Sequence, residues 1–587
     1  MIDNKENIRS ILATIYPAEK NETIYTAIQQ LVQDFKRTSN LSASVEISRP
    51  RFSEKDIILI CYGDHLQEPD QLPLTTLYTF LQDHLAGLVN SVHILPFFPY
   101  SSDDGFSVIN YRKVATDLGD WKEINEISKN FKLMVDFVLN HISTKSEWFQ
   151  NFLINNPPFI EYFITVDPAL DLSNVVRPRS TALLSPFQTA TWNKYLWTTF
   201  NSDQVDLNYQ NPQVLIEMID ILLFYVKQGA QIIRLDAIAY LWKSPGTNCI
   251  NLPQTHQIVK ILRSVLDQIA PGIALVTETN VPHNENISYF GEYNPDLKSS
   301  DEAQLVYQFP LAPLILNAFL NGNSNKLLKW VEELPALQEG SVFLNFTASH
   351  DGIGIRPVEQ ILSPEETHKL VSSILEHGGQ VSTKSNSDGT NSVYELNATW
   401  YDAINVLSTP DDELCIERFI ASQVIMLSLA GVPGIYFSSL FGARNCIDCF
   451  EKTGRQRSIN REKYNLTTLN NKLGNPNSVF AKIFKRYKKL LTIRSTSDAF
   501  DPNADQKVIW VNNSIFSILR QSKTGEYILC LVNLTEKHQQ VKLSLTNLKL
   551  FGKTIWTDKI SSKTHSVEND YLDVVLSPYQ SFWLHSS

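Results

Sequence analysis

Residues 229–242 read Gly-Ala-Gln-Ile-Ile-Arg-Leu-Asp-Ala-Ile-Ala-Tyr-Leu-Trp. The two isoleucines and the leucine after the arginine predict a short buried strand, because β-branched and aliphatic side chains suit one. Arg234 lies inside this strand, and Asp236 lies at its end. An unpaired buried charge costs on the order of several kcal/mol. Each of these charges must therefore have a partner or a chemical role.

Two more carboxylates occupy similar positions, because Glu278 and Asp351 each follow a short apolar run. Three acids at the ends of three strands, separated by helix-sized gaps, predict the rim of an α/β fold, the (β/α)8 barrel. That rim is where barrel enzymes place their catalytic residues. A strand-end salt bridge or a helix cap would explain any one acid equally well. All three together, with His141 and His350 in the same pattern, favour a catalytic rim.

Composition narrows the class of protein. A chain of 587 residues with an apolar fraction of 43% is typical of a large globular protein, and its net charge of −11 argues against nucleic acid and anionic membranes as partners. Six cysteines are too few for a disulfide scaffold and suit a reducing compartment. Cys446 and Cys449 form a lone CxxC pair, which is a weak zinc motif, so we expect no metal and no cofactor. No signal peptide or membrane span is evident, which predicts a cytoplasmic protein.

The chain divides into segments of different pattern. Prolines and aromatic residues interrupt the strand–helix rhythm at 150–210, and a Gly/Ser/Asn-rich run at 378–392 predicts a mobile loop over the rim. Short alternating strands begin at about 505. We therefore predict a helical N-terminal extension (1–55), a catalytic barrel (56–500) with an inserted subdomain (150–210) and a loop-rich insertion (355–405), and a C-terminal β-sandwich of antiparallel strands (505–587).

The three acids suit glycosyl transfer with retention of configuration, which needs two carboxylates about 5 Å apart across a sugar bond. Arg234 lies two residues before Asp236 on the same strand and points to the same face, so it favours an ionised nucleophile. Glu278 follows an apolar strand and is flanked on both sides by uncharged threonines. These surroundings suit an acid that stays protonated. Asp351 can bind sugar hydroxyls more tightly as the ring flattens in the transition state.

Four stretches resemble the conserved regions of the α-amylase family, and the resemblance extends from about residue 56 to the end of the chain. They are Asp136-Phe-Val-Leu-Asn-His141, Ile233-Arg-Leu-Asp236, Val276-Thr-Glu278 and Phe346-Thr-Ala-Ser-His350-Asp351. This resemblance implies that Asp236 is the nucleophile, Glu278 the acid/base and Asp351 the transition-state stabiliser. It also places Asn140, His141, Arg234 and His350 around the glucose.

A finer pattern is similar to the sucrose phosphorylase branch of that family. The motifs that carry it are Leu95-Pro-Phe-Phe-Pro99, Asp103-Asp-Gly-Phe106-Ser-Val108, Arg177-Pro-Arg179, Tyr240, Ser349-His-Asp-Gly-Ile-Gly354, Tyr394-Glu-Leu-Asn397 and Arg457-Ser-Ile-Asn-Arg461. The resemblance adds Phe106 and Tyr240 to the substrate-binding residues. It places Asp64 and Arg457 at the far end of the glucose.

Phosphate would be bound in that branch by Tyr394 and by one arginine of the Arg-Pro-Arg segment, here Arg177 or Arg179. A buried phosphate needs positive charge nearby, which agrees with this implication. The alternative for these two arginines is a solvated loop without a role in binding.

Two positions depart from the sucrose enzymes, which typically carry His where this chain has Asn280 and Gln where it has Glu395. Both positions are expected to face the acceptor. With the N-terminal extension, these residues are more similar to glucosylglycerate phosphorylases of the same branch. Fructose is therefore not the expected acceptor. The sequence alone does not decide between glycerate, glycerol, fructose 6-phosphate and fructose.

We therefore predict a retaining phosphorylase that converts a small α-glucoside and inorganic phosphate into α-D-glucose 1-phosphate through a covalent glucosyl-enzyme. A hydrolase or transglucosidase acting with the same residues is the alternative enzyme. A non-catalytic amylase-like module is an alternative of another class. Such a module is expected to lack the acids and to carry a membrane helix, whereas this sequence has the acids and shows no membrane span. The sequence allows a homodimer without settling the oligomeric state.

Overall fold

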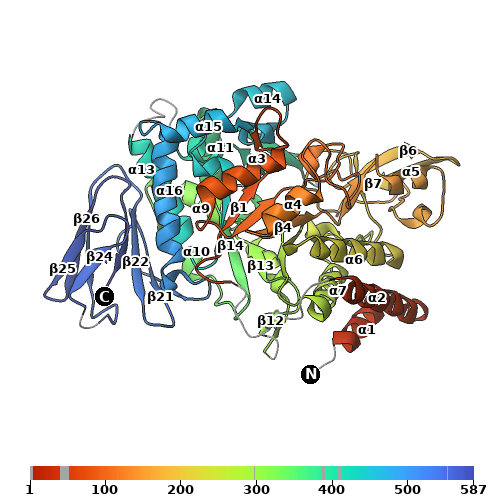
Figure 1. Ribbon diagram of the computed structural model, residues 1–587, viewed down its shortest axis with the longest axis horizontal. Coiled ribbons are helices and arrows are strands. Elements are labelled where there is room, and N and C mark those ends of the chain that lie inside the picture. Colours follow the sequence, from red (N-terminus) through yellow and green to blue (C-terminus); the bar gives the residue numbers. More distant parts are fainter. Residues whose placement is uncertain are drawn as a thin grey trace.

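The protein is described here from a computed structural model that covers residues 4–39, 52–295, 298–386, 390–405, 413–550 and 553–586. A barrel with its helices occupies the centre of the molecule, the C-terminal sheet lies at one end, and the N-terminal helices lie toward the other (Figure 1). The predicted α/β class with a (β/α)8 barrel is confirmed.

Eight parallel strands close the barrel in the order β1-β18-β14-β13-β10-β9-β4-β3. The apolar runs before Asp236, Glu278 and Asp351 predicted β9, β10 and β14, whereas the three residues of β13 are too few to show a period. The strands are β1 Ile58–Cys61, β3 Ser91–Ile94, β4 Lys132–Phe137, β9 Ala230–Leu235, β10 Ala274–Thr277, β13 Leu305–Tyr307, β14 Val342–Phe346 and β18 Val432–Tyr436.

The strand register brings the charged residues of the central stretch together. Arg234 on β9 pairs in register with Asp136 on β4 and with Val276 on β10. The ladder continues past the strand ends, because the amide of Asp236 donates to the carbonyl of Phe137 at 3.2 Å. The amide of Glu278 donates in the same way to the Leu235 carbonyl, also at 3.2 Å. These bonds fix the two acids at one level of the rim.

Helices surround the barrel, and two further helices at the N-terminus pack against this outer layer. The helices α1 and α2 pack on α7 and α6, and Ile8, Leu12 and Ile28 of this pair are fully buried (Figure 1). The main helices are α1 Asn4–Ile15, α2 Ala18–Thr38, α3 Pro73–Phe80, α4 Trp121–Ser128, α6 Pro212–Lys227, α7 Pro253–Ile269, α9 Leu311–Asn321, α10 Asn325–Glu332, α13 Glu413–Ser428, α15 Leu466–Gly474 and α16 Val479–Ser495. None of the described helices has the length and apolar character that a membrane crossing needs.

Two excursions from the barrel build the walls above the rim. The first, between β4 and α6, contains the helix α5 (Glu147–Leu153), the hairpin of β6 (Leu184–Gln188) and β7 (Asn193–Trp197), and the pair of β5 (His141–Ser143) and β8 (Gln204–Asp206). The second follows β14 and contains β15 (Ile353–Gly354), α11 (Pro364–Glu376), β16 (Gln380–Ser385), β17 (Asn391–Asn397) and α12 (Trp400–Ile404).

The prediction of a mobile loop at 378–392 is wrong for most of the run that the structure describes. Residues Gln380–Ser385 form β16, and the run ends inside β17; both belong to a three-stranded sheet with β15. Residues 387–389 lie outside the described part of the chain. The ladder between β16 and β17 overrides the turn-forming composition, since strand propensity depends strongly on pairing and burial.

The C-terminal strands form one antiparallel sheet in the order β20-β21-β22-β27-β24-β25-β26-β23, so the antiparallel β domain is confirmed. Leu529 near one end of this order and Leu572 near the other share one apolar core with Trp556, so the sheet curls around it. The strands are β20 Asp505–Val508, β21 Ile515–Gln521, β22 Tyr527–Asn533, β23 Gln539–Ser544, β24 Ile555–Asp558, β25 Thr564–Glu568, β26 Tyr571–Leu576 and β27 Ser581–His585.

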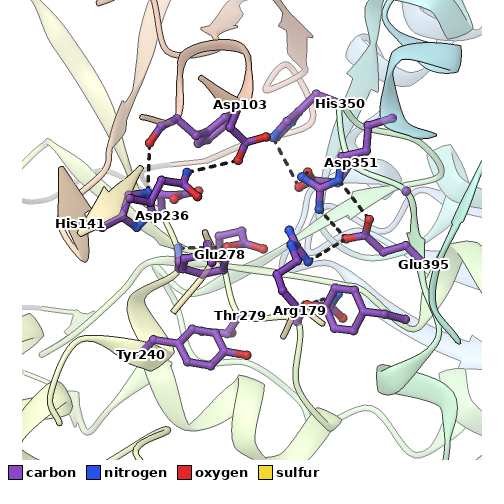
Figure 2. A pocket seen from close by; sticks show the side chains of 18 of the residues that line it. Asp103, His141, Arg179, Asp236, Tyr240, Glu278, Thr279, His350, Asp351 and Glu395 are labelled. Atoms are coloured by element: carbon purple, nitrogen blue, oxygen red, sulfur yellow. Dashed lines mark hydrogen bonds and ion pairs between the residues drawn. The ribbon is translucent and has the colours of Figure 1, made fainter. Parts of the chain in front are cut away.

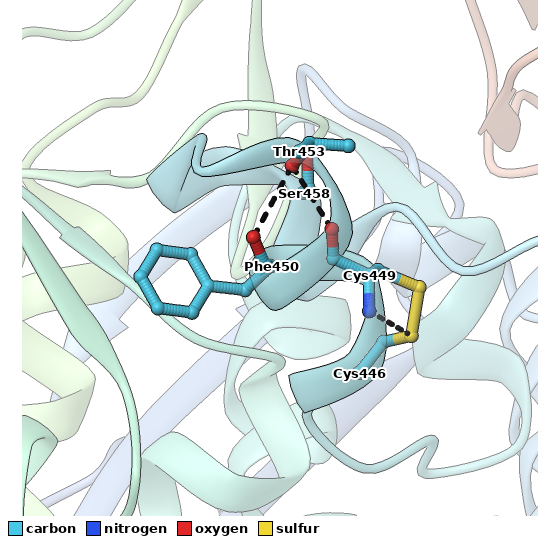
Figure 3. Close-up of a disulfide and its surroundings, with 5 residues drawn as sticks. All are labelled: Cys446, Cys449, Phe450, Thr453 and Ser458. Atoms are coloured by element: carbon cyan, nitrogen blue, oxygen red, sulfur yellow. Dashed lines mark hydrogen bonds between the residues drawn. A yellow bond between two sulfur atoms is a disulfide. The ribbon is translucent and has the colours of Figure 1, made fainter.

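The CxxC pair corrects the expectation of reduced cysteines. Cys446 and Cys449 form a disulfide at the start of the helix α14 (Ile447–Thr453), as Figure 3 shows. Their Cα atoms lie 5.2 Å apart, within the usual reach of a disulfide. In this state neither sulfur is a thiolate that could bind zinc, so the weak zinc motif is not a metal site here.

Candidate active site

A polar pocket opens at the carboxyl ends of the barrel strands, and side chains from several elements point into it (Figure 2). Asp236 follows β9, Glu278 follows β10 and Asp351 follows β14, so the barrel brings the three predicted catalytic acids to one cavity. The other predicted residues that line it are Phe106, His141, Tyr240, Asn280, His350, Tyr394, Glu395, Arg457 and Arg179.

Arg234 lies beneath this pocket and organises its charges. Its guanidinium donates to Asp136 through a short hydrogen bond and to Asp236 at 2.6 Å, and it reaches Glu278 at 3.9 Å. Asp136 also bonds His93 at 2.6 Å. Burial alone would raise the pKa of Asp136, but the charges of Arg234 and His93 lower it to about 2. The buried arginine therefore has ionised partners, which offsets its desolvation cost.

The acids Asp236 and Glu278 share this one arginine. Burial raises the pKa of both carboxyl groups, and Arg234 opposes that effect. Because Arg234 hydrogen-bonds Asp236 at 2.6 Å but lies 3.9 Å from Glu278, the charge is best stabilised on Asp236 and the proton on Glu278. This geometry suits a nucleophile at Asp236 and an acid at Glu278.

The backbone between these acids holds Glu278 in place. The amide of Ala237 donates to Glu278 Oε2 at 3.0 Å. Ala237 has a φ of 50°, in the left-handed region that costs a non-glycine residue on the order of 1 kcal/mol or more. The chain keeps this conformation directly after the candidate nucleophile, where it turns the amide toward the candidate acid.

Asp351 stays ionised among cationic groups. Arg457 Nη1 lies 2.5 Å from its Oδ1, and His350 Nε2 lies 3.4 Å from its Oδ2. Burial would raise the pKa of Asp351, but Arg457 is the largest of the charges that hold it well below its usual value. A carboxylate fixed in this form can bind sugar hydroxyls and stabilise positive charge on the ring.

Two histidines line the pocket in their neutral form, because burial lowers the pKa of both His141 and His350. His141 Nε2 donates to the carbonyl of Phe106 at 3.0 Å. The ring of Phe106 stacks on His350 with centroids 4.9 Å apart. Tyr240 faces Phe200 edge-on at 5.6 Å, which adds a second aromatic wall.

Arg179, Tyr394 and Asn280 form another side of the pocket. The Arg179 guanidinium lies 5.3 Å from the ring centre of Tyr394 and 5.7 Å from that of Phe200. Asn280 Nδ2 donates to the Tyr394 hydroxyl at 3.3 Å. Tyr394 belongs to β17 rather than to a mobile loop. The structure thus places a cation, a hydroxyl and an amide together in this cavity.

Glu395 points into the pocket and is 2% exposed. Arg457 donates to both of its oxygens, at 3.0 and 2.5 Å, and Arg179 lies 3.9 Å away. Arg457 therefore bridges Glu395 and Asp351. The sequence could not show this, because Glu395 lies on a strand with loop-like composition and Arg457 is distant from it along the chain.

Four predicted residues do not line the pocket, and Arg234, which lies beneath it, is one of them. Asp64 forms an ion pair with Lys463 at 2.5 Å. Asn140 is buried in a polar network, donating to Asp206 at 3.1 Å and accepting from Lys243 at 2.6 Å. Arg177 also lies outside the lining, so Arg179 is the member of the Arg-Pro-Arg segment that faces the site.

Asp103, which was not among the predicted site residues, lines the pocket. It accepts from Gln204 Nε2 at 3.2 Å and has a φ of 54°. Gly105 follows with a φ of 111°, and a Cβ atom there would lie 2.5 Å from the Pro96 carbonyl oxygen, so the turn requires glycine. The Asp-Asp-Gly run was the available sequence signal. Phe200, Gln204, Thr279 and Phe309 also line the cavity and were not predicted.

The fold and the site define a glycoside-transforming enzyme, and the chain belongs to the α-amylase family. Residues 83–351 match the family described as alpha amylase, catalytic domain. The chain is 46% identical over 534 residues to the glucosylglycerate phosphorylase of Allomeiothermus silvanus, covering 91% of each. It is 40% identical over 583 residues to that of Escherichia coli K12, covering 99% of this chain and 100% of the relative.

Within the family, these relatives place the chain in the sucrose phosphorylase branch. Glucosylglycerate phosphorylases are 40–46% identical to it, compared with 27% for the sucrose phosphorylase of Bifidobacterium adolescentis. A crystal structure of sucrose 6F-phosphate phosphorylase from Thermoanaerobacter thermosaccharolyticum superposes with a TM-score of 0.70. It covers 89% of this chain and 98% of that one, at 22% identity, which supports the shared fold.

Proposed function

We propose that the protein is a retaining phosphorylase of a small α-glucoside and releases α-D-glucose 1-phosphate. The observation that carries this proposal is the position of Arg179 beside Tyr394 in the cavity that holds Asp236 and Glu278. A hydrolase needs only water at this place. A phosphorylase needs a cation that can bind an oxyanion next to the reacting carbon.

The proposed reaction has two steps. The Asp236 carboxylate attacks the anomeric carbon while Glu278 donates its proton to the departing glycosidic oxygen, leaving a glucosyl ester on Asp236. Phosphate then attacks the same carbon from the vacated side and gives its proton to Glu278, which regenerates both groups. Asp351 stabilises the positive charge that develops on the ring in each step.

Phosphate and the acceptor occupy one place in turn, so an acidic acceptor would use the same cation. We assign glycerate to this position, because Arg179 and the Asn280 amide can donate to its carboxylate. Glu395 can accept from its hydroxyl groups, while the bidentate bond from Arg457 limits the repulsion of phosphate. A cytoplasmic location is part of the proposal, since an ionised sugar phosphate does not cross a membrane unaided.

The test is to incubate the enzyme with glucosylglycerate, with and without inorganic phosphate, and to quantify glucose and glucose 1-phosphate separately. Phosphate-dependent glucose 1-phosphate is the expected product. Free glucose at the same rate under both conditions would indicate a hydrolase. The reverse reaction, with glucose 1-phosphate and glycerate, glycerol, fructose or fructose 6-phosphate, identifies the acceptor.

A further inference from the structure

A second cavity, of about 290 Å³, adjoins the active-site pocket. The two cavities share Asp103, Arg179, Glu395 and Arg457, so these side chains form the wall between them. We name the second cavity the arginine vestibule, defined by Arg179, Arg455, Arg457 and Arg461. Because the Arg457–Glu395 ion pair belongs to the shared wall, a ligand in the vestibule would contact a group that also contacts the active site.

Arginine side chains outnumber carboxylates among the residues that line the vestibule. Four guanidinium groups and two carboxylates, those of Asp103 and Glu395, belong to its lining. Two acids outside this lining balance it: Asp104 accepts from Arg461 at 2.5 Å, and Asp351 lies 2.5 Å from Arg457. Hydroxyl donors contribute as well: Ser382 lines the cavity at the bulge of β16, and its oxygen accepts from Asn397 at 2.9 Å, which leaves its own proton to donate. Such a lining suits an oxyanion.

One N–H group of Arg461, a residue of the vestibule lining, has no acceptor in the described part of the chain. The residue is 7% exposed, and its Nη2 is buried without a hydrogen-bond partner in the described part of the chain. The closest carboxylate oxygen, on Asp351, is 4.0 Å away. The rest of this guanidinium is satisfied, by Asp104 at Nη1 and by the His350 carbonyl at Nε, so one N–H group of Arg461 remains unpaired beside the vestibule.

Arg455 supplies the exposed side of the vestibule. Its side chain is 53% exposed, and its ion pair with Asp104 is long, at 3.5 Å. A guanidinium held this loosely is free to contact an anion that arrives from solvent. Arg461 lies deeper and Arg457 lies in the shared wall, so three arginines lead from solvent toward the pocket.

We infer that the arginine vestibule is a second anion-binding site, which binds a small oxyanion next to the active site. The ligand chemistry is that of inorganic phosphate or of the carboxylate of an acidic acceptor. This inference rests on the proposed phosphorylase function and extends it. Binding in the vestibule raises the local concentration of the anion beside the glucosyl-enzyme. There the anion competes for the glucosyl group with water, which is far more concentrated.

The test compares Arg455→Gln with the matched control Lys452→Gln. Lys452 is an exposed cation at the end of α14 that lines neither cavity. In the phosphorolysis direction, kcat/KM for phosphate should fall about threefold to tenfold in Arg455→Gln at low ionic strength, and the loss should shrink as salt is added. The control should remain within about a factor of 1.5 of the unmodified enzyme.

A second arm separates the two sources of oxyanion. With glucose 1-phosphate as donor, the ratio of kcat/KM for glycerate to that for the neutral analogue glycerol is measured in each variant. A ratio that falls only in Arg455→Gln assigns the vestibule to the acceptor carboxylate too. An unchanged ratio with a lower kcat/KM for phosphate assigns it to phosphate alone.

Direct binding separates this inference from the proposed function. Inorganic phosphate is titrated into the unmodified protein and both variants, and its ³¹P NMR line width is followed. Weaker binding in Arg455→Gln alone supports the vestibule even if no glucose 1-phosphate is ever formed, a result that would refute only the phosphorylase. Equal behaviour of Arg455→Gln and Lys452→Gln in all three measurements would refute the inference that the vestibule binds an anion.

Discussion

Arg179→Ala should raise the KM for phosphate about 10- to 30-fold, whereas Arg177→Ala should change it less than about twofold. At a separation of 4 Å and an effective dielectric constant of about 20, two unit charges interact with roughly 4 kcal/mol. The Arg179 side chain is 26% exposed and lies 3.9 Å from Glu395, so solvent screening and this carboxylate reduce its contribution. We therefore take about half of this interaction energy, roughly 1.5 to 2 kcal/mol, as the contribution of Arg179 to phosphate binding. Its loss corresponds to the roughly 10- to 30-fold rise in KM.

The assay measures initial rates of phosphorolysis over a range of phosphate concentrations, with glucose 1-phosphate and free glucose determined separately. Arg179→Ala should also increase the share of glucose, because water then competes better for the glucosyl-enzyme. Arg177→Ala is the matched control, since it removes one arginine from the same segment but lies outside the pocket lining. Equal effects of the two substitutions on the phosphate KM, or no effect of either, would refute this reasoning.

Asp236→Asn should reduce turnover at least about a thousandfold with little change in melting temperature, because an amide cannot form the glucosyl ester; near-normal phosphorolysis would exclude it as nucleophile. Glu278→Gln should be inactive on glucosylglycerate but still be glucosylated by α-glucosyl fluoride, whose leaving group needs no proton. Burial raises the pKa of Glu278, so the rate on glucosylglycerate should fall as pH rises through that pKa, and a rate insensitive to alkaline pH would contradict this role. Asp103→Ala should lower kcat/KM for the glucoside at least about tenfold and Asp64→Ala less than about twofold; the opposite order would restore Asp64 to the glucose site.

Particular residues show where sequence reasoning succeeds. Asp236, Glu278 and Asp351 could be expected at one cavity, because a closed parallel barrel brings the carboxyl ends of all its strands to the same rim. The pairing of Arg234 with Asp236 follows from the two-residue period of a strand. The sequence also showed the similarity to phosphorylases of this family, which the relatives confirm.

Other features lacked a periodic signal. The strand β13 is three residues long, and the hairpin of β16 and β17 has the composition of a loop. Asp64 and Asp103 both follow strands near the rim, and only the left-handed turn before Gly105 directs Asp103 into the pocket. The disulfide of Cys446 likewise depends on how the chain enters α14.

The sequence by itself determined the barrel and the three acids at its rim, since strands and helices repeat with regular periods, and its motifs indicated the family. Only the tertiary structure decided that Arg179 rather than Arg177 faces the pocket and that Arg457 bridges Asp351 and Glu395. These side chains lie on segments whose conformation is set by packing between excursions far apart in the chain. The direction of each side chain there depends on contacts that no local pattern encodes.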